Sequence, residues 1–295
     1  MKKNSIVLLI LFTVSLAFAT ETDLENQWFK KDLSVNERNV LVEQSKKEPF
    51  EKIAPIVFKV LNECPFLDGC ITKYDPPWSD DRYSSDEKTH LMASEVMNHF
   101  KFPKNDLQKA KVILSLLQKT KLEHEKSSFI AWLNHYHWCP DAENVLLDIA
   151  TNKNTALYIR AESIKTLLNH CDVNSYMPLA IEIIYAHKKE QRPHEFNYII
   201  NQGNNKLLKL DRKNMQLLLN TGFNILNEIP ENELKSGYHL ASHLGGILKI
   251  KNKFKPDQSA KKYQGKYRLT DDYFIDTVKN ALDYYSSHKK EIQNK

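Results

Sequence analysis

Residues 144–172 read NVLLDIATNKNTALYIRAESIKTLLNHCD and contain two apolar stripes separated by the short polar break NKN. On both sides of the break apolar residues return every three or four positions, which is the period of a helix with one buried face. The pattern therefore predicts two amphipathic helices packed against each other. Their apolar positions are Val145, Leu146 and Ile149 in the first helix and Leu157, Ala161, Ile164, Leu167 and Leu168 in the second.

The spacing between such stripes is regular over part of the chain. Ile130 and Ile164 are 34 residues apart, and Leu133 and Leu167 have the same separation. A repeat of this length with two amphipathic helices per unit is typical of an α-solenoid, in which each unit covers the apolar side of its neighbour. The alternative is a pair of packed helices in a bundle without repeats.

The second stripe also carries a recognisable core sequence, ALYIRAESIKTLLNHCD at residues 156–172. It resembles the second helix of a HEAT-like repeat, in which an Arg-Ala-x-x-Ile/Leu core is usual, and the resemblance is best over residues 106–187. The resemblance implies an all-α fold, specifically a right-handed α-solenoid of degenerate HEAT-like helix pairs with an irregular N-terminal part and a C-terminal capping helix. It implies no catalytic residues, because the matching positions are structural: Arg160, Ala161, Ile164 and Leu167.

The N-terminus has the layout of a secretory signal peptide. Lys2 and Lys3 precede an almost unbroken apolar run from Ile6 to Ala19, and the end of this run, Ala-Phe-Ala, has the small residues required at a cleavage site. The run is short for a membrane span, although a retained N-terminal anchor is the alternative. We predict cleavage after Ala19, export to the periplasm or the medium, and no stable membrane span in the mature chain.

Three regions are expected along the chain. Residues 1–19 are the signal peptide, residues 20–105 are an N-terminal helical segment with an irregular disulfide loop, and residues 106–295 are the HEAT-like repeat region with its capping helix. Within the last region, residues 231–248 are expected to form one helix, and Thr270 is expected to cap the final helix.

Two capping boxes predict helix starts in the N-terminal segment. Ser34 with Glu37 and Ser84 with Glu87 both place a hydroxyl residue three positions before a glutamate. Residues 64–84, between the two helices that surround them, contain DPPWSDD, and adjacent prolines with clustered aspartates predict an irregular stretch.

Composition excludes several classes of function. The chain has only 7 glycines, whereas phosphate loops and tightly turned β-structures depend on glycine. Its formal net charge of +5 falls by two when Lys2 and Lys3 leave with the signal peptide, and so small a basic excess does not indicate nucleic acid. The chain lacks the Gly-x-Ser-x-Gly, phosphate-loop and dinucleotide motifs. No cofactor is expected.

The four cysteines are an even number, which fits export into an oxidising compartment. Of the three pairings available we favour Cys64 with Cys70, which flank a short loop, and Cys139 with Cys171, each expected just after a helix. The second bond would join neighbouring repeats. Metal binding by four thiols is the rival interpretation, but the spacing contains no Cys-x-x-Cys element.

Residues 249–268, KIKNKFKPDQSAKKYQGKYR, are rich in lysine with aromatic residues between the charges. Such a segment can bind a polyanion by charge and stacking, and a solvated lysine-rich loop is the alternative. Export favours an anionic envelope polymer or a protein partner over intracellular nucleic acid. The candidate binding residues are Lys255, Lys261, Lys262, Tyr263, Lys266, Tyr267 and Arg268.

His239 and His243 are four residues apart and share one face of a predicted helix, where they could bind one metal ion. A zinc protease has glutamate directly after the first histidine, but here that residue is Leu240. A metal-dependent enzyme that uses these histidines is therefore the second hypothesis. The first is an exported HEAT-like scaffold that binds a protein or an anionic envelope polymer without catalysis.

Overall fold

The computed structural model describes residues 21–64, 76–79, 82–200, 205–265 and 269–294. These residues form α-helices, short 3-10 helices and turns, without a named strand. Their one β-type pairing is an isolated bridge between Gln264 and Leu269. The fold is all-α, as the sequence predicted.

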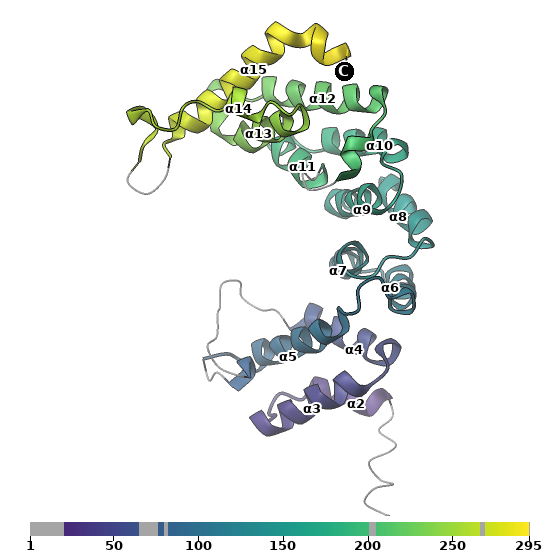
Figure 1. Cartoon of the computed structure of the whole chain (residues 1–295). Helices are drawn as coiled ribbons and strands as arrows, with labels where there is room; N and C mark the ends of the chain where they lie inside the picture. Colours follow the sequence, from purple (N-terminus) through teal and green to yellow (C-terminus); the bar gives the residue numbers. More distant parts are fainter. Residues whose placement is uncertain (1–20, 65–75, 80–81, 201–204, 266–268, 295) are drawn as a thin grey trace, which may run out of the picture. The chain divides into compact units, whose positions relative to one another are not determined.

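The chain divides into two compact units, Met1–Trp138 and Cys139–Lys295, and Figure 1 labels their helices. The division lies C-terminal to the expected one between residues 105 and 106. Unit 1 contains α2 (Glu21–Trp28), α3 (Val35–Lys47), α4 (Phe50–Glu63), η1 (Pro77–Ser79), α5 (Ser85–Phe100), α6 (Leu107–Lys119) and α7 (Glu123–His135). Unit 2 contains α8 (Ala142–Thr151), α9 (Leu157–His170), α10 (Val173–Ala186), α11 (Arg192–Ile199), η2 (Asn205–Lys209), α12 (Arg212–Asn227), η3 (Glu231–Gly237), α13 (Tyr238–Ile247), α14 (Lys251–Phe254), η4 (Lys261–Tyr263) and α15 (Asp271–Asn294).

Both predicted capping boxes are present in unit 1. The side chain of Ser34 accepts a hydrogen bond from the backbone N–H of Glu37, and the Glu37 carboxylate accepts one from the backbone N–H of Ser34. Ser84 and Glu87 repeat this exchange at the start of α5. Each box satisfies backbone N–H groups that the first helical turn leaves without a partner.

Helix α4 is the centre of unit 1, because it packs against α2, α5, α6 and α7. Aromatic residues form the contacts. The rings of Phe58 and Phe129 are 4.8 Å apart, those of Phe58 and Trp132 are 5.5 Å apart, and those of Phe50 and Phe100 are 5.1 Å apart. Tilted and edge-on aromatic pairs add specific geometry to the area they bury, so this cluster fixes how the helices of unit 1 cross.

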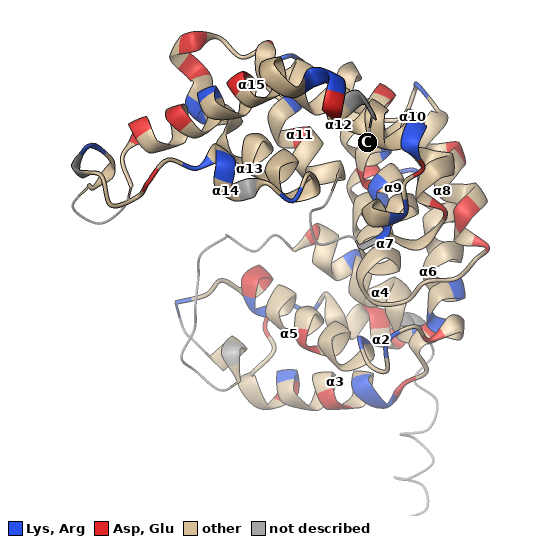
Figure 2. Ribbon diagram, turned by 45° about the horizontal axis from the view of Figure 1, so that its top comes forward, with Lys and Arg blue, Asp and Glu red and all other residues tan. Residues whose placement is uncertain are grey.

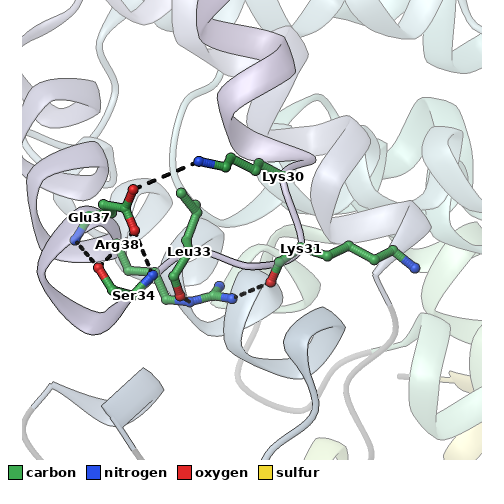
Figure 3. A network of polar contacts seen from close by, with 6 residues as sticks. All are labelled: Lys30, Lys31, Leu33, Ser34, Glu37 and Arg38. Carbon is green, nitrogen blue, oxygen red and sulfur yellow. Dashed lines mark hydrogen bonds and ion pairs between the residues drawn. The ribbon is translucent and has the colours of Figure 1, made fainter.

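A buried arginine ties the turn between α2 and α3 to the rest of unit 1. Arg38 is only 3% exposed, and Figure 3 shows its guanidinium reaching back to the carbonyl oxygens of Leu33 and Lys31. It also donates to the hydroxyls of Ser85 and Thr89 on α5 and to the sulfur of Met92. These acceptors are all neutral, and they occupy the donor positions of the guanidinium. Burial lowers the pKa of Arg38 from its ordinary value.

Unit 2 is built from helices that contact both the next helix and the one after it. Helix α9 packs against α8, α10 and α11, and α11 in turn packs against α12 and α13; Figure 1 shows these helices following one another. Ile164 and Leu167 of the predicted stripe are fully buried. Arg160, in the position that suggested a HEAT-like core, donates from Nε to the carbonyl of Ala150 at 2.8 Å and so satisfies a carbonyl in the last turn of α8.

The single helix expected over residues 231–248 is wrong. A 3-10 helix covers the first part, and α13 begins only after Gly237. A Cβ atom at Gly237 would lie 2.7 Å from the side chain of Ile229 and 3.0 Å from that of Leu226. A side chain at residue 237 would therefore displace the ends of these two side chains, a constraint that helical periodicity alone does not reveal.

Candidate functional site

The two histidines of the predicted metal pair have different environments. His239 is exposed, whereas His243 is 3% exposed, with Nδ1 lying 3.1 Å from Oδ1 of Asn197 and its ring beside Phe196. His243 thus contributes to the contact between α11 and α13. Over the part of the chain that the structure describes, no cluster of three or more His, Cys, Asp or Glu residues could hold a metal ion.

The basic segment is partly folded onto α15. Nζ of Lys262 lies 2.8 Å from Oδ2 of Asp276, and the hydroxyl of Tyr263 donates to the same oxygen at 2.8 Å. Tyr263 and Phe254 are buried, so these rings are not available for stacking on a ligand. Figure 2 shows acidic residues along α15 close to the basic residues that precede it. Lys255 is half-buried.

Most of the other candidate binding residues of this segment are not described by the structure. The side chain of Lys261 and residues 266–268, which include Lys266, Tyr267 and Arg268, lie outside the described residues. Asp276 raises the pKa of Lys262, chiefly through their hydrogen bond. Lys262 therefore keeps its charge, but Asp276 compensates it.

The predicted disulfide between Cys139 and Cys171 is absent from the structure, in which Cys171 carries a free thiol. The side chain of Cys171 lies beside Glu143. Burial raises the pKa of Cys171 to about 12, and the charge of Glu143 acts in the same direction. The predicted Cys64–Cys70 pairing involves Cys70, which lies outside the described residues.

Three helices of unit 2 pack in series, with α11 against both α9 and α13, and carry a surface that the sequence analysis did not identify. We call it the α9–α11–α13 face and define it by exposed and half-buried side chains. The buried residues between them, such as Ile164 on α9 and Phe196 on α11, hold the helices together. The face consists of Tyr158, Glu162 and Lys165 on α9, His194 and Tyr198 on α11, and His239 on α13.

Tyr198 contacts three other residues of this face. Its hydroxyl donates a hydrogen bond to Oε1 of Glu162. Nζ of Lys165 lies 3.6 Å from the centre of its ring, which is a close cation–π contact. The imidazole of His194 is nearly parallel to the ring, at 6.3 Å and 8°. Two helices thus fix one tyrosine between opposite charges and a second flat ring.

The electrostatics of this group follow from partial burial. Burial raises the pKa of Tyr198, and the hydrogen bond to Glu162 raises it further, so the phenol stays protonated and remains a donor. Burial lowers the pKa of Lys165, while the charge of Glu162 opposes that shift. Because the Tyr198 hydroxyl donates to Glu162 and Lys165 covers one face of its ring, the group presents a charged pair and the exposed His194 ring to a ligand. Tyrosine is enriched in protein interfaces and among the residues that dominate their affinity.

The sequence contained one signal that could have found this group. Tyr198 follows Glu162 by 36 residues, which is close to the 34-residue spacing of the apolar stripes. When repeats stack, polar residues at equivalent positions on the second helices of consecutive repeats are expected to meet. Periodicity of apolar residues alone could not show this.

Comparison with protein-family models, with curated proteins and with solved structures found no match. The likeness to HEAT-like repeats consequently depends on the internal pattern of this chain. Among the described residues, no helix combines the length and the apolar character needed to cross a bilayer.

Proposed function

We propose that this protein is an exported binding protein built from HEAT-like helix pairs stacked as a right-handed solenoid, and that it recognises a protein partner through the α9–α11–α13 face. The observation that carries the proposal is the ordered group of Glu162, Lys165, His194 and Tyr198. Its members come from two stacked helices and are positioned before any partner binds. Preorganised side chains lose less conformational entropy on binding.

A protein partner fits this face better than an anionic polymer fits the basic segment. Interfaces between proteins favour tyrosine at their centre and have a polar rim. The face has that composition, with Glu162 and Lys165 on either side of Tyr198. By contrast, Asp276 compensates Lys262 in the basic segment, and the ring of Tyr263 is buried.

The proposal also includes export of the protein, and this part is supported by the N-terminal sequence. Lysines, an apolar run and small residues before position 20 support cleavage after Ala19 and a periplasmic or extracellular location. N-terminal sequencing of the protein recovered from the cell envelope and from the medium tests this part separately. An N-terminus at Met1 would contradict it.

The binding proposal is tested by capture experiments with matched variants. The immobilised protein is incubated with the envelope and extracellular fractions of its native cell, and captured proteins are identified by mass spectrometry. A variant with Lys165→Ala and Tyr198→Ala should lose the specific partner, because truncating one interface hot spot costs about 2 kcal/mol or roughly 30-fold in affinity. Loss should occur without a change in the far-UV circular dichroism spectrum.

The matched control carries Glu182→Ala and Lys213→Ala, which also removes two exposed side chains from unit 2, on α10 and α12. It should capture the partner as the unmodified chain does. Equal capture by both double variants would show that the α9–α11–α13 face is not the binding surface.

A further inference from the structure

The turn between α5 and α6 and the first residue of α6 expose two large apolar side chains of unit 1. Phe102 is 66% exposed and Leu107 is 47% exposed. Exposing two such residues five positions apart is costly unless another surface covers them, and neighbouring exposed apolar residues mark interaction sites. We call residues 101–107 together with Lys111 the Phe102 tip.

Specific hydrogen bonds hold the tip in its shape. Nζ of Lys109 donates to the carbonyl oxygens of Phe100 at 3.1 Å and Phe102 at 3.0 Å. The backbone N–H of Asn105, a residue with φ of 61°, donates to the carbonyl of Tyr136 at 2.8 Å. Because the backbone on both sides of Phe102 is fixed, the ring is held on the surface by the fold.

The charges around these apolar residues are mostly positive. Residues 101–111 contain four lysines and one aspartate. That aspartate, Asp106, accepts from the backbone N–H groups of Gln108 and Lys109 and caps α6. The ammonium groups of Lys101 and Lys104 lie 4.9 Å and 6.0 Å from the centre of the Tyr136 ring. Both lysines belong to the same turn as Phe102, so two positive charges lie on this turn.

The outer face of α6 continues the same pattern. Lys111 is exposed and lies one turn after Leu107, on the same side of the helix. An apolar residue and a lysine therefore alternate from the turn into the helix. Apolar side chains placed among lysines are typical of proteins that bind at the surface of an anionic bilayer, where the rings enter the interface and the ammonium groups meet phosphates. Lysine is depleted in interfaces between proteins.

We propose that the Phe102 tip binds the surface of an anionic phospholipid membrane. Phe102 and Leu107 enter the region between headgroups and acyl chains, and Lys101, Lys104 and Lys111 contact the lipid phosphates. The site is in unit 1 and shares no residue with the α9–α11–α13 face, so either can fail without the other. Binding of this kind is peripheral and reversible.

Sedimentation of the full chain with vesicles tests the proposal. Vesicles of phosphatidylcholine with one part in three of phosphatidylglycerol should bind the protein more tightly than phosphatidylcholine alone. Changing Lys101 and Lys104 to Gln should weaken partitioning about 10- to 30-fold, because each lysine near such a surface contributes about 1 kcal/mol. Phe102→Ser should weaken it about tenfold. The control is Val40→Ser, which removes a side chain of the same 66% exposure on α3 of the same unit and should change nothing.

Depth of insertion gives an independent measurement. Brominated phosphatidylglycerol should quench the tryptophan fluorescence of a Phe102→Trp variant more than that of the unmodified chain, whose N-terminal apolar run is identical.

Lys111→Gln provides a second charge variant on an exposed helix surface, and it should weaken partitioning about fivefold. Equal binding by all variants, or no preference for anionic vesicles, would overturn the proposal. So would binding to dextran sulfate that depends on the lysines but not on Phe102, since it would indicate a soluble polyanion.

Discussion

The two units hold their helices together in different ways. In unit 2, hydrogen bonds between side chains join residues about one repeat apart: Tyr176 with Glu143 over 33 residues and Arg192 with Glu228 over 36. In unit 1, Arg38 reaches residues on α5 that are 47 and 51 positions away, and Lys46 reaches Glu95 on the same helix over 49 positions. Polar contacts are thus distributed along unit 2, whereas in unit 1 five hydrogen bonds are concentrated at one buried side chain, that of Arg38. We expect unit 1 to be more sensitive to a single substitution.

The largest expected effect is that of Arg38→Ala. The substitution removes all five hydrogen bonds of the guanidinium and leaves the Leu33 carbonyl without its side-chain donor, so it should destabilise unit 1 by about 2–4 kcal/mol. Arg192→Ala is the matched change in unit 2. Arg192 also caps carbonyls, those of Tyr185 and His187, but its partner Glu228 is partly exposed, so about 1 kcal/mol is expected.

Urea unfolding followed by two probes separates these effects. All four tryptophans are in residues 1–138, so tryptophan fluorescence follows unit 1, whereas circular dichroism follows both units. Arg38→Ala should shift the fluorescence transition to lower urea. If Arg192→Ala shifts that transition as much as Arg38→Ala does, stabilisation is not concentrated as we infer.

A smaller effect is expected from pH, through His137 in unit 1. The ring is fully buried, with Nε2 lying 3.0 Å from the carbonyl of Phe100. Burial lowers its pKa, with a further decrease from Lys109, while the Phe100 carbonyl and Asp106 act in the opposite direction. As the pH falls, His137 therefore takes up a proton in the unfolded chain at a higher pH than in the folded chain. The contribution of His137 to the free energy of unfolding is fully present above the ordinary histidine pKa of about 6.5, and it decreases as the pH falls below that value.

Between pH 7 and pH 5.5 this decline should reach about 1 kcal/mol in unit 1. His137→Gln should reduce the pH dependence of the tryptophan-detected transition over that range, even if it lowers the stability at pH 7. His99→Gln changes an exposed histidine on α5 and should leave the pH dependence as it is. An unchanged slope in His137→Gln would exclude this histidine as its source.

The smallest effect is chemical and concerns Cys171 in unit 2. With a pKa of about 12, its thiolate fraction at pH 8 is roughly a thousandfold below that of an ordinary thiol. Iodoacetamide should therefore label Cys171 slowly in the native protein and rapidly in urea without reductant, as measured by mass spectrometry. A disulfide with Cys139 would instead block labelling in urea until reductant is added.

Local sequence signals predicted much of the fold. Ser34 and Ser84 were identified as helix caps because a capping box needs only residues three positions apart. The buried stripe of α9 was identified because one helix face requires only the helical period. The start of α13 after Gly237 was not predicted, because it depends on how this backbone packs against Ile229 and Leu226.

The candidate site was predicted much less well. The histidine pair and the basic segment were chosen from local composition, but His243 is buried against α11 and Lys262 is bound to α15. The group around Tyr198 was missed, because Lys165 and Tyr198 belong to different helices. Their contact depends on how α9 and α11 pack.

By itself the sequence determined the helices of this protein and the side of each helix that is buried, because backbone hydrogen bonding and amphipathic period act over a few residues. Only the tertiary structure decided which polar side chains meet, which cysteine is held beside a carboxylate, and which apolar residues stay on the surface. Those outcomes depend on distances between segments that are far apart in the chain. They are set when the helices pack, and no local pattern specifies them.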